Sequence, residues 1–230
     1  MLFAFGAPAV GAGYMYLLLA LYVMKFSTDV LLIAPAIMGL IFSVSRIWDA
    51  ISDPLVGYLS DRTTTALGRR RTWILFSFVP IAIGFYAVFA PPVSLSGDAL
   101  TWWMAASIIG FYSAMTIFFV PHMALGAELS NDYHERSRLF GLRHAFYTVG
   151  SILSLGTMQL LLNEEFREGG DVRAMAEEYA LYAIIAMSVL VLYAVVNLRE
   201  RPEFQGRLNS SPTSAFRDVW QNPHARLLVI

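Results

Sequence analysis

Hydrophobic residues follow one another along this chain in six long blocks, which are separated by short polar stretches. The blocks cover residues 3–24, 33–60, 73–91, 100–127, 140–162 and 179–198. Each is close to or above the roughly 20 residues that a helix needs to cross a bilayer. The ten-residue alternating segments of a membrane β-barrel do not occur. The pattern therefore predicts an all-α integral membrane protein with six spans.

Composition agrees with this prediction. The 230 residues are 57% hydrophobic and 14% charged, whereas a soluble domain carries about 25% charged residues. The net charge of −1 does not suggest nucleic acid as a partner, and without cysteine the chain has no disulfide or thiolate metal site. The N-terminal block is uncharged as far as Lys25 and is interpreted as a first membrane helix rather than a signal peptide.

The polar connections carry unequal positive charge. Arginine is concentrated in three of them, at residues 61–71, 131–138 and 199–207. The connections on the other side contain only Lys25, Arg167 and Arg173. The positive-inside rule then predicts a multi-pass protein of the cell membrane whose N-terminus is cytoplasmic. The acidic external stretch 163–178 is expected to carry a short surface helix.

The last residues differ from the helical blocks. Residues 199–222 are polar and rich in Ser, Pro and Asn, which predicts a cytoplasmic linker after a six-helix bundle at 1–198. Residues 223–230 become apolar again, and we interpret them as the start of a seventh membrane helix. The sequence is therefore expected to be incomplete.

Charged residues interrupt the second block in the stretch "RIWDAISDPLVG", residues 46–57. Each charge near the centre of a membrane helix costs about 2.5–3.5 kcal/mol. Asp49 and Asp53 are four residues apart, so their side chains share one helix face. Two such carboxylates can hold one small cation together or share one proton. Ser52 offers a further oxygen, and Arg46 is one turn away from Asp49 and can pair with it.

Two other interpretations of this cluster fit the sequence less well. An interhelical salt-bridge cluster would explain Arg46 but would leave one carboxylate without a role, and buried charges in bundles usually mark ion pathways. A membrane-embedded aspartyl hydrolase would need carboxylates that face each other, normally from separate helices. No Ser–His–Asp set or zinc-type His spacing occurs either. A cation site is favoured, and an enzyme is not expected.

The sequence resembles the glycoside–pentoside–hexuronide:cation symporters, a branch of the major facilitator superfamily that includes melibiose permease. The resemblance rests on four stretches, "TDV" at 28–30, "RIWDAISDP" at 46–54, "GYLSDRTTTALGRRR" at 57–71 and "PHMALGAELSNDYHERSR" at 121–138. It implies the N-terminal half of a twelve-helix transporter that carries a sugar or glycoside with Na⁺ or H⁺. No cofactor other than the transported cation is implied. The partner that the resemblance implies is the C-terminal half of the same transporter.

The resemblance also implies roles for single residues. Asp49 and Asp53 would bind the coupling cation, with Ser52 in the position of an amide ligand and Thr116 as a hydroxyl ligand. Arg143 in the fifth block matches an arginine that faces the substrate cavity. Four tyrosines could contact a sugar, or could instead face lipid or pack against other helices: Tyr14, Tyr16, Tyr112 and Tyr147.

Two positions depart from melibiose permease. The acid on its first helix that holds galactosides falls on Gly13, and the acid on its fourth helix that sugar and cation share falls on Phe119. Transport is therefore supported, but melibiose as the substrate is not. A carrier of a lysolipid or a drug-like amphiphile on the same scaffold is the alternative.

The basic loop after the second block matches a gate motif of the superfamily. The resemblance implies salt bridges there that break when the cytoplasmic gate opens, with the motif residues Gly57, Asp61, Arg62, Gly68, Arg69 and Arg70. His122 follows Pro121 near the end of the fourth block. Imidazole could relay protons, but we expect a hydrated histidine at the helix end.

Overall fold

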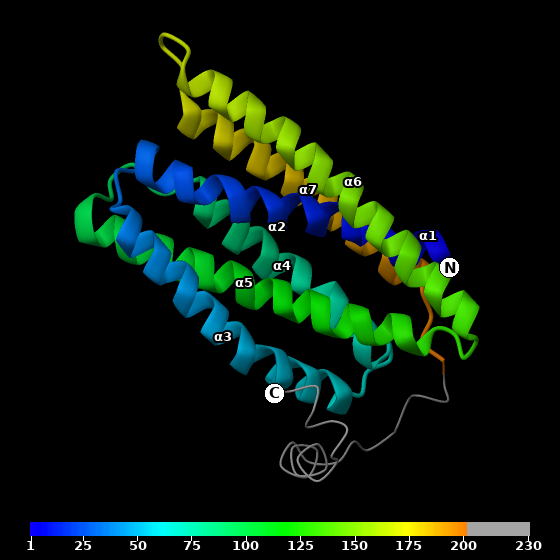
Figure 1. The fold of residues 1–230 in the computed structure, drawn as a ribbon. Coiled ribbons are helices and arrows are strands. Elements are labelled where there is room, and N and C mark those ends of the chain that lie inside the picture. Colours follow the sequence, from blue (N-terminus) through cyan, green and yellow to red (C-terminus); the bar gives the residue numbers. More distant parts are fainter. Residues whose placement is uncertain (202–230) are drawn as a thin grey trace, which may run out of the picture.

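The computed structural model describes residues 1–201, and within this range six long helical segments run alternately up and down (Figure 1). The first joins α1 (Leu2–Gly6) and α2 (Pro8–Lys25) and ends in a π-helical turn at Phe26–Val30. The other five are α3 (Pro35–Arg62), α4 (Arg69–Phe89), α5 (Gly97–Glu128), α6 (Tyr133–Glu165) and α7 (Val172–Asn197).

Helix α2 lies in the middle of the bundle. It packs extensively on α6 and also contacts α7, while α4 packs on α5 and α7, and α3 lies along α5. In Figure 1 the N-terminus, the α3–α4 connection and the end of α7 gather at one end of the bundle. This end holds Arg62, Arg69 and Arg70 and is called the basic end below.

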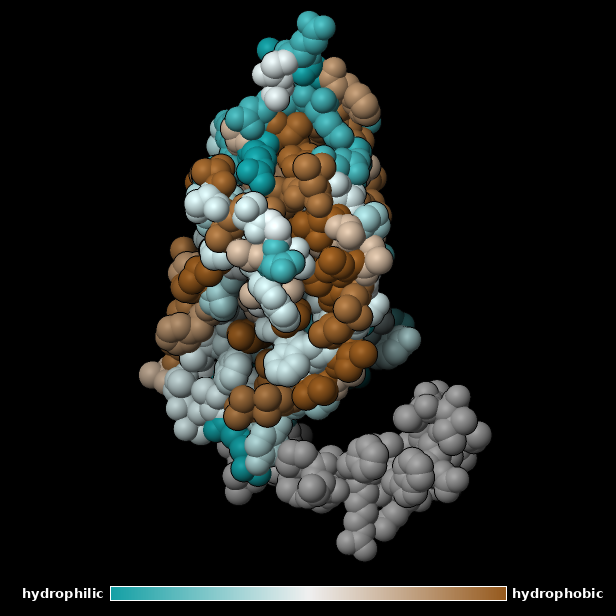
Figure 2. Space-filling model, turned by 90° about the vertical axis from the view of Figure 1, so that its left-hand side faces the viewer, coloured by the Kyte–Doolittle hydropathy of each residue, from teal (hydrophilic) through white to brown (hydrophobic). Residues whose placement is uncertain are grey.

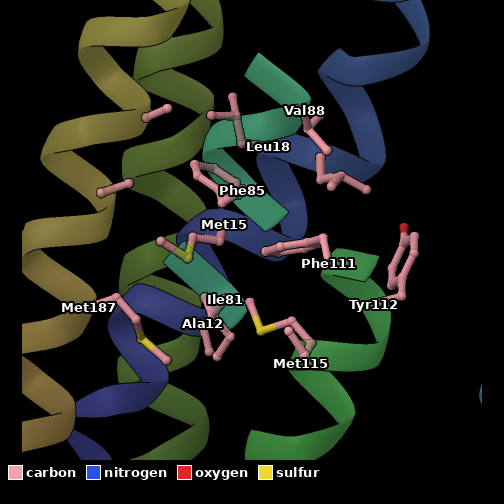
Figure 3. Packing of buried hydrophobic residues seen from close by; sticks show 14 of the residues in the cluster. Ala12, Met15, Leu18, Ile81, Phe85, Val88, Phe111, Tyr112, Met115 and Met187 are labelled. Carbon is pink, nitrogen blue, oxygen red and sulfur yellow. The ribbon is translucent and has the colours of Figure 1, made fainter. Parts of the chain in front are cut away.

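The apolar core forms where α2, α4 and α5 meet (Figure 3). Met15, Phe85 and Phe111 are fully buried there, and the rings of Phe85 and Phe111 lie 5.4 Å apart. A Cβ atom on Gly84 would lie 2.9 Å from the Cα atom of Phe111. The absence of a side chain at this position therefore lets α4 and α5 approach closely, as helix packing in lipid requires.

Five of the helical segments are long and apolar enough to cross a membrane, Leu2–Val30, Arg69–Phe89, Gly97–Glu128, Tyr133–Glu165 and Val172–Asn197. Helix α3, which carries the charged cluster, is not one of these five segments. Its 28 residues still give about 42 Å at 1.5 Å per residue, which exceeds the roughly 30 Å of a hydrocarbon core. The predicted all-α membrane architecture is confirmed.

The helices extend beyond the predicted apolar blocks. Helix α6 begins at Tyr133 rather than at residue 140, and α7 begins at Val172 rather than at residue 179. The expected short surface helix at 163–178 is wrong, because residues 172–178 form the first turns of α7. Hydropathy locates only the apolar part of a helix, whereas backbone hydrogen bonds continue through its polar ends.

The surface agrees with a membrane environment. In Figure 2 hydrophilic residues gather at the top of the view, where α6 connects to α7, and apolar side chains cover much of the face below. Large apolar side chains such as Ile47, Ile51 and Ile152 are exposed. Only residues 199–201 of the predicted linker at 199–222 are described, and the predicted helix start at 223–230 lies outside the described residues.

Candidate functional site

The two aspartates of α3 line a cavity of about 110 Å³ between α2, α3 and α5. The polar and aromatic part of its wall consists of Tyr16, Asp49, Asp53, Tyr112, Thr116 and Phe119. Four of these residues, Asp49, Asp53, Thr116 and Phe119, were predicted from the sequence as site residues. The fold therefore brings together predicted residues that are up to 70 positions apart, since Asp49 and Phe119 line the same space.

Arg46 is held at the edge of this cavity by three groups. It pairs with Asp49 at 3.2 Å and donates hydrogen bonds of 2.7 Å to the hydroxyls of Tyr16 and Tyr112. Its guanidinium carbon also lies 4.3 Å from the centre of the Tyr112 ring, within cation–π range. Tyr112 stands at the margin of the apolar cluster in Figure 3. The predicted pairing of Arg46 with Asp49 is present.

The two carboxylates differ in their partners. Asp53 accepts a hydrogen bond of 2.9 Å from the hydroxyl of Thr116. Asp49 binds Arg46 through Oδ2, while its Oδ1 atom is buried and accepts no hydrogen bond. A buried carboxylate oxygen without a donor is costly, and a small cation or a proton would satisfy it. The carboxylate and hydroxyl oxygens are also ligands of the type that hard cations prefer.

Ser52 has a different position from the one expected of a ligand. Its side chain is buried, its hydroxyl bonds at 3.4 Å to the backbone oxygen of Asp49, and it does not line the cavity. Among residues 1–201 no group of three or more His, Asp or Glu side chains forms a metal site. The candidate cation site therefore has two carboxylates and the Thr116 hydroxyl as its core.

Three of the predicted substrate residues do not line this cavity. A Cβ atom on Gly13 would lie 2.2 Å from the carbonyl oxygen of Tyr147, so this glycine allows α2 and α6 to touch. Arg143 on α6 lies beside Phe119, with its guanidinium carbon 5.7 Å from the centre of the ring. Phe119 thus lines the cavity and also lies against Arg143, while Gly13 and Tyr147 form a helix contact.

His122 is not the hydrated histidine that we expected. Its side chain is fully buried on α5, and its Nε2 atom lies 2.9 Å from the carbonyl oxygen of Phe5. The expectation failed because the sequence does not show that α1 covers this end of α5. Apart from Pro121 before it, nothing in the local sequence marks His122 as buried.

The basic end holds a network of ion pairs. Arg70 pairs with Asp61 at 2.5 Å and with Glu128 at 3.2 Å, and Arg69 pairs with Glu128 at 2.6 Å. Both arginine side chains are buried. Arg62 lies outside this network, with its guanidinium carbon 4.2 Å from the centre of the Tyr58 ring. The network joins the ends of α3, α4 and α5.

The two predicted gate glycines have different surroundings. Gly68 has a φ of +108°, which glycine adopts without strain. A Cβ atom there would also lie 2.6 Å from the carboxyl carbon of Glu200. Gly57 has room for a side chain, because the nearest atom to a Cβ would be Val120 Cγ1 at 3.6 Å. Of the two, only Gly68 thus stands at a position where the local geometry requires glycine.

Sequence reasoning predicted Asp61 but missed two other acids at the basic end, Glu128 and Glu200. Glu200, which follows α7, accepts hydrogen bonds from the backbone N–H groups of Arg69, Arg70 and Arg71 at 3.0, 2.8 and 2.7 Å. It therefore caps the N-terminus of α4, where a carboxylate is favoured. Glu128 could have been noticed as an acid at the end of an apolar block. Nothing in the sequence around Glu200 indicates its distant partner.

Known proteins with similar sequences are membrane transporters. The inner membrane symporter YicJ of Escherichia coli is 31% identical over 211 residues, which are 90% of this chain and 44% of that protein. The isoprimeverose transporter of Lactiplantibacillus pentosus is 30% identical over 205 residues, 86% of this chain and 41% of that protein. The sodium-dependent lysophosphatidylcholine symporter 1 of Xenopus tropicalis is 30% identical over 148 residues, 64% of this chain and 28% of that protein.

The chain spans less than half the length of each of these relatives. The family described as MFS/sugar transport protein matches residues 4–230. This match includes the charged cluster of α3, the basic end and all six helical segments. The chain is therefore a multi-pass membrane protein that belongs to the MFS/sugar transport protein family.

Proposed function

We propose that this chain forms half of a secondary active transporter that couples the entry of a sugar or glycoside to the entry of Na⁺ or H⁺. The observation that carries the proposal is the cavity with Asp49, Asp53 and Thr116 on two membrane helices. Ionisable groups at membrane depth are costly and mark ion pathways. The names of the relatives, two symporters and a sugar transporter, support the same activity.

In this proposal the coupling cation binds between Asp53, the free oxygen of Asp49 and the Thr116 hydroxyl. Arg46 neutralises Asp49, so a cation at Asp53 would cancel the remaining negative charge of the cluster. Removing that charge stabilises the conformation that binds substrate. Coupling is then the difference in free energy that cation and substrate impose on the two conformations.

The network at the basic end would close the cytoplasmic side of the transporter. The positive-inside rule supports this orientation, because arginines are concentrated at the basic end. It also supports a cytoplasmic N-terminus, since residue 1 lies at the same end (Figure 1). Opening of the gate would require Arg69 and Arg70 to leave Glu128 and Asp61.

The opposite wall of the substrate site would come from a second six-helix half. Relatives more than twice as long as the matched segment support this view. Transporters of this superfamily bind substrate between two such halves near the membrane midplane.

A lysolipid or similar amphiphile is the second candidate substrate. Phe119 makes the cavity wall less polar than an acid would, and one group of relatives is named for lysophosphatidylcholine. A hydrolase remains disfavoured, because Asp49 and Asp53 lie on one helix and Arg46 is bound to Asp49.

The test is uptake by the full-length protein in sealed vesicles under an imposed Na⁺ or H⁺ gradient. A neutral glycoside, a glucuronide and lysophosphatidylcholine serve as substrates. We expect the glycoside to accumulate and the accumulation to disappear with an ionophore that dissipates the gradient. Preference for lysophosphatidylcholine would favour the second candidate substrate. Uptake that depends on neither the Na⁺ nor the H⁺ gradient would contradict symport.

A further inference from the structure

His122 occupies a rigid position between three helical segments. The imidazole is fully buried on α5, and it stacks on the rings of Phe5 and Phe118 at centroid distances of 4.5 and 4.9 Å. The angles between the ring planes are 10° and 20°. Stacking against two phenylalanines fixes the plane of the imidazole and thus the direction of both ring nitrogens.

Both ring nitrogens have partners of opposite type. The Nε2 atom lies 2.9 Å from the carbonyl oxygen of Phe5, and the Nδ1 atom lies 3.4 Å from the Nε atom of Arg143. A carbonyl oxygen can only accept, and a guanidinium N–H can only donate. The tautomer that satisfies both partners is the neutral imidazole with its proton on Nε2. An imidazolium would place an N–H group against the Nε–H group of Arg143.

Arg143 is half-buried on α6, and it has no ion-pair partner among residues 1–201. Its hydrogen bond to His122 uses only the Nε edge of the guanidinium. Because the acceptor is a neutral imidazole rather than a carboxylate, the arginine keeps its charge uncompensated. The two Nη groups remain as a planar fork of donors, which suits bidentate recognition of oxygen atoms.

We propose that His122 is a positioning residue for Arg143 in the proposed transport cycle. Its neutral ring ties Arg143 of α6 to the backbone of α1 and holds the guanidinium beside Phe119. The Nη edge is thereby kept available for oxygen atoms of the transported molecule. This inference rests on the proposed function, since a transported molecule is its ligand, but the clamp between His122 and Arg143 can be measured separately.

Three variants of the full-length protein separate this role from simple core packing. In His122→Asn the amide oxygen can take the place of Nδ1 and accept from Arg143. In His122→Gln the amide nitrogen can take the place of Nε2 and donate to Phe5, whereas His122→Phe keeps only the stacking. A packing role predicts no such distinction between the two amides.

The readout is the substrate KM for uptake, with the maximal rate and the thermal unfolding temperature of each variant as controls. We expect His122→Asn to keep a KM close to that of the wild type. His122→Gln and His122→Phe should raise KM by about tenfold, the value of one hydrogen bond to a charged group. Equal effects of the Asn and Gln variants would overturn the inference.

A second measurement does not depend on transport. Nitrogen-15 NMR of the full-length protein in membranes reports which ring nitrogen carries the proton, and the His122 signals are assigned by their loss in His122→Asn. We expect Nε2–H with an accepting Nδ1, whose resonance moves in Arg143→Ala. A proton on Nδ1, or no response to Arg143→Ala, would overturn the clamp. Absence of coupled uptake by the wild type would instead contradict the proposed function.

Discussion

Thr116 on α5 donates a hydrogen bond of 2.9 Å to Asp53 on α3, and this contact makes the two aspartates of the cluster unequal. Asp49 is paired with Arg46 at 3.2 Å. Among residues 1–201 no basic side chain lies within 4.0 Å of Asp53. In the proposed function, Asp53 is therefore the carboxylate whose charge a coupling cation would neutralise, while Asp49 would add its buried Oδ1 atom.

Replacement of the acids should uncouple transport. We expect Asp53→Asn to abolish accumulation against a gradient but to leave downhill exchange, because only the cation ligand is lost. Asp49→Asn should reduce exchange as well, since it also releases Arg46 from its ion pair. Accumulation and exchange of labelled substrate are measured in vesicles, with the exposed Asp98→Asn as control. Normal accumulation by both variants would show that the charged cluster has a structural role instead.

The contact between α2 and α6 should depend on glycine at one position and not at another. A Cβ atom on Gly150 would lie 1.9 Å from the carbonyl oxygen of Val10, whereas a Cβ atom on Gly156 would point into open space within the described part of the chain. Gly150→Ala should therefore lower the free energy of unfolding by about 1–3 kcal/mol through overpacking. Thermal unfolding in detergent measures this, and Gly156→Ala on the same helix should behave like the wild type.

Arg70 should stabilise the closed basic end more than Arg62 does. Arg70 is buried and contacts Asp61, Glu128 and Ser60, and loss of one partner from a buried pair costs about 3–5 kcal/mol. Arg70→Ala should open this end, which raises the labelling of a cysteine introduced at Ser60. Arg62→Ala is the matched control, because Arg62 is exposed. Equal labelling in both variants would argue against the gate.

The orientation can be tested with introduced cysteines, because the native chain has none. Thr64 lies in the α3–α4 connection and Glu168 in the α6–α7 connection, and both are exposed. In intact cells an impermeant thiol reagent should label Glu168→Cys and not Thr64→Cys. Glu168 is preferable to Gly170, where a Cβ atom would lie 2.2 Å from the carbonyl oxygen of Glu164. Labelling of Thr64→Cys alone would show that the orientation in the membrane is the reverse of the predicted one.

The sequence determined the class of the protein and the approximate position of its helices. Apolar blocks of about 20 residues leave few alternatives in a membrane, because every backbone polar group must be satisfied within the segment. The spacing of Asp49 and Asp53 was equally informative, because four residues place two side chains on one helix face by geometry alone. The prediction that Arg46 pairs with Asp49 succeeded for the same local reason.

Tertiary structure decided everything that depends on which helices touch. The sequence alone did not place the Tyr16 and Tyr112 hydroxyls on Arg46, or Glu200 on the backbone of α4. Gly13 was expected in the substrate cavity, yet it faces the backbone of Tyr147. His122 was expected in water, yet α1 covers it. Local patterns specify a helix and its faces, whereas the neighbour of each face follows from packing between segments that are far apart in the chain.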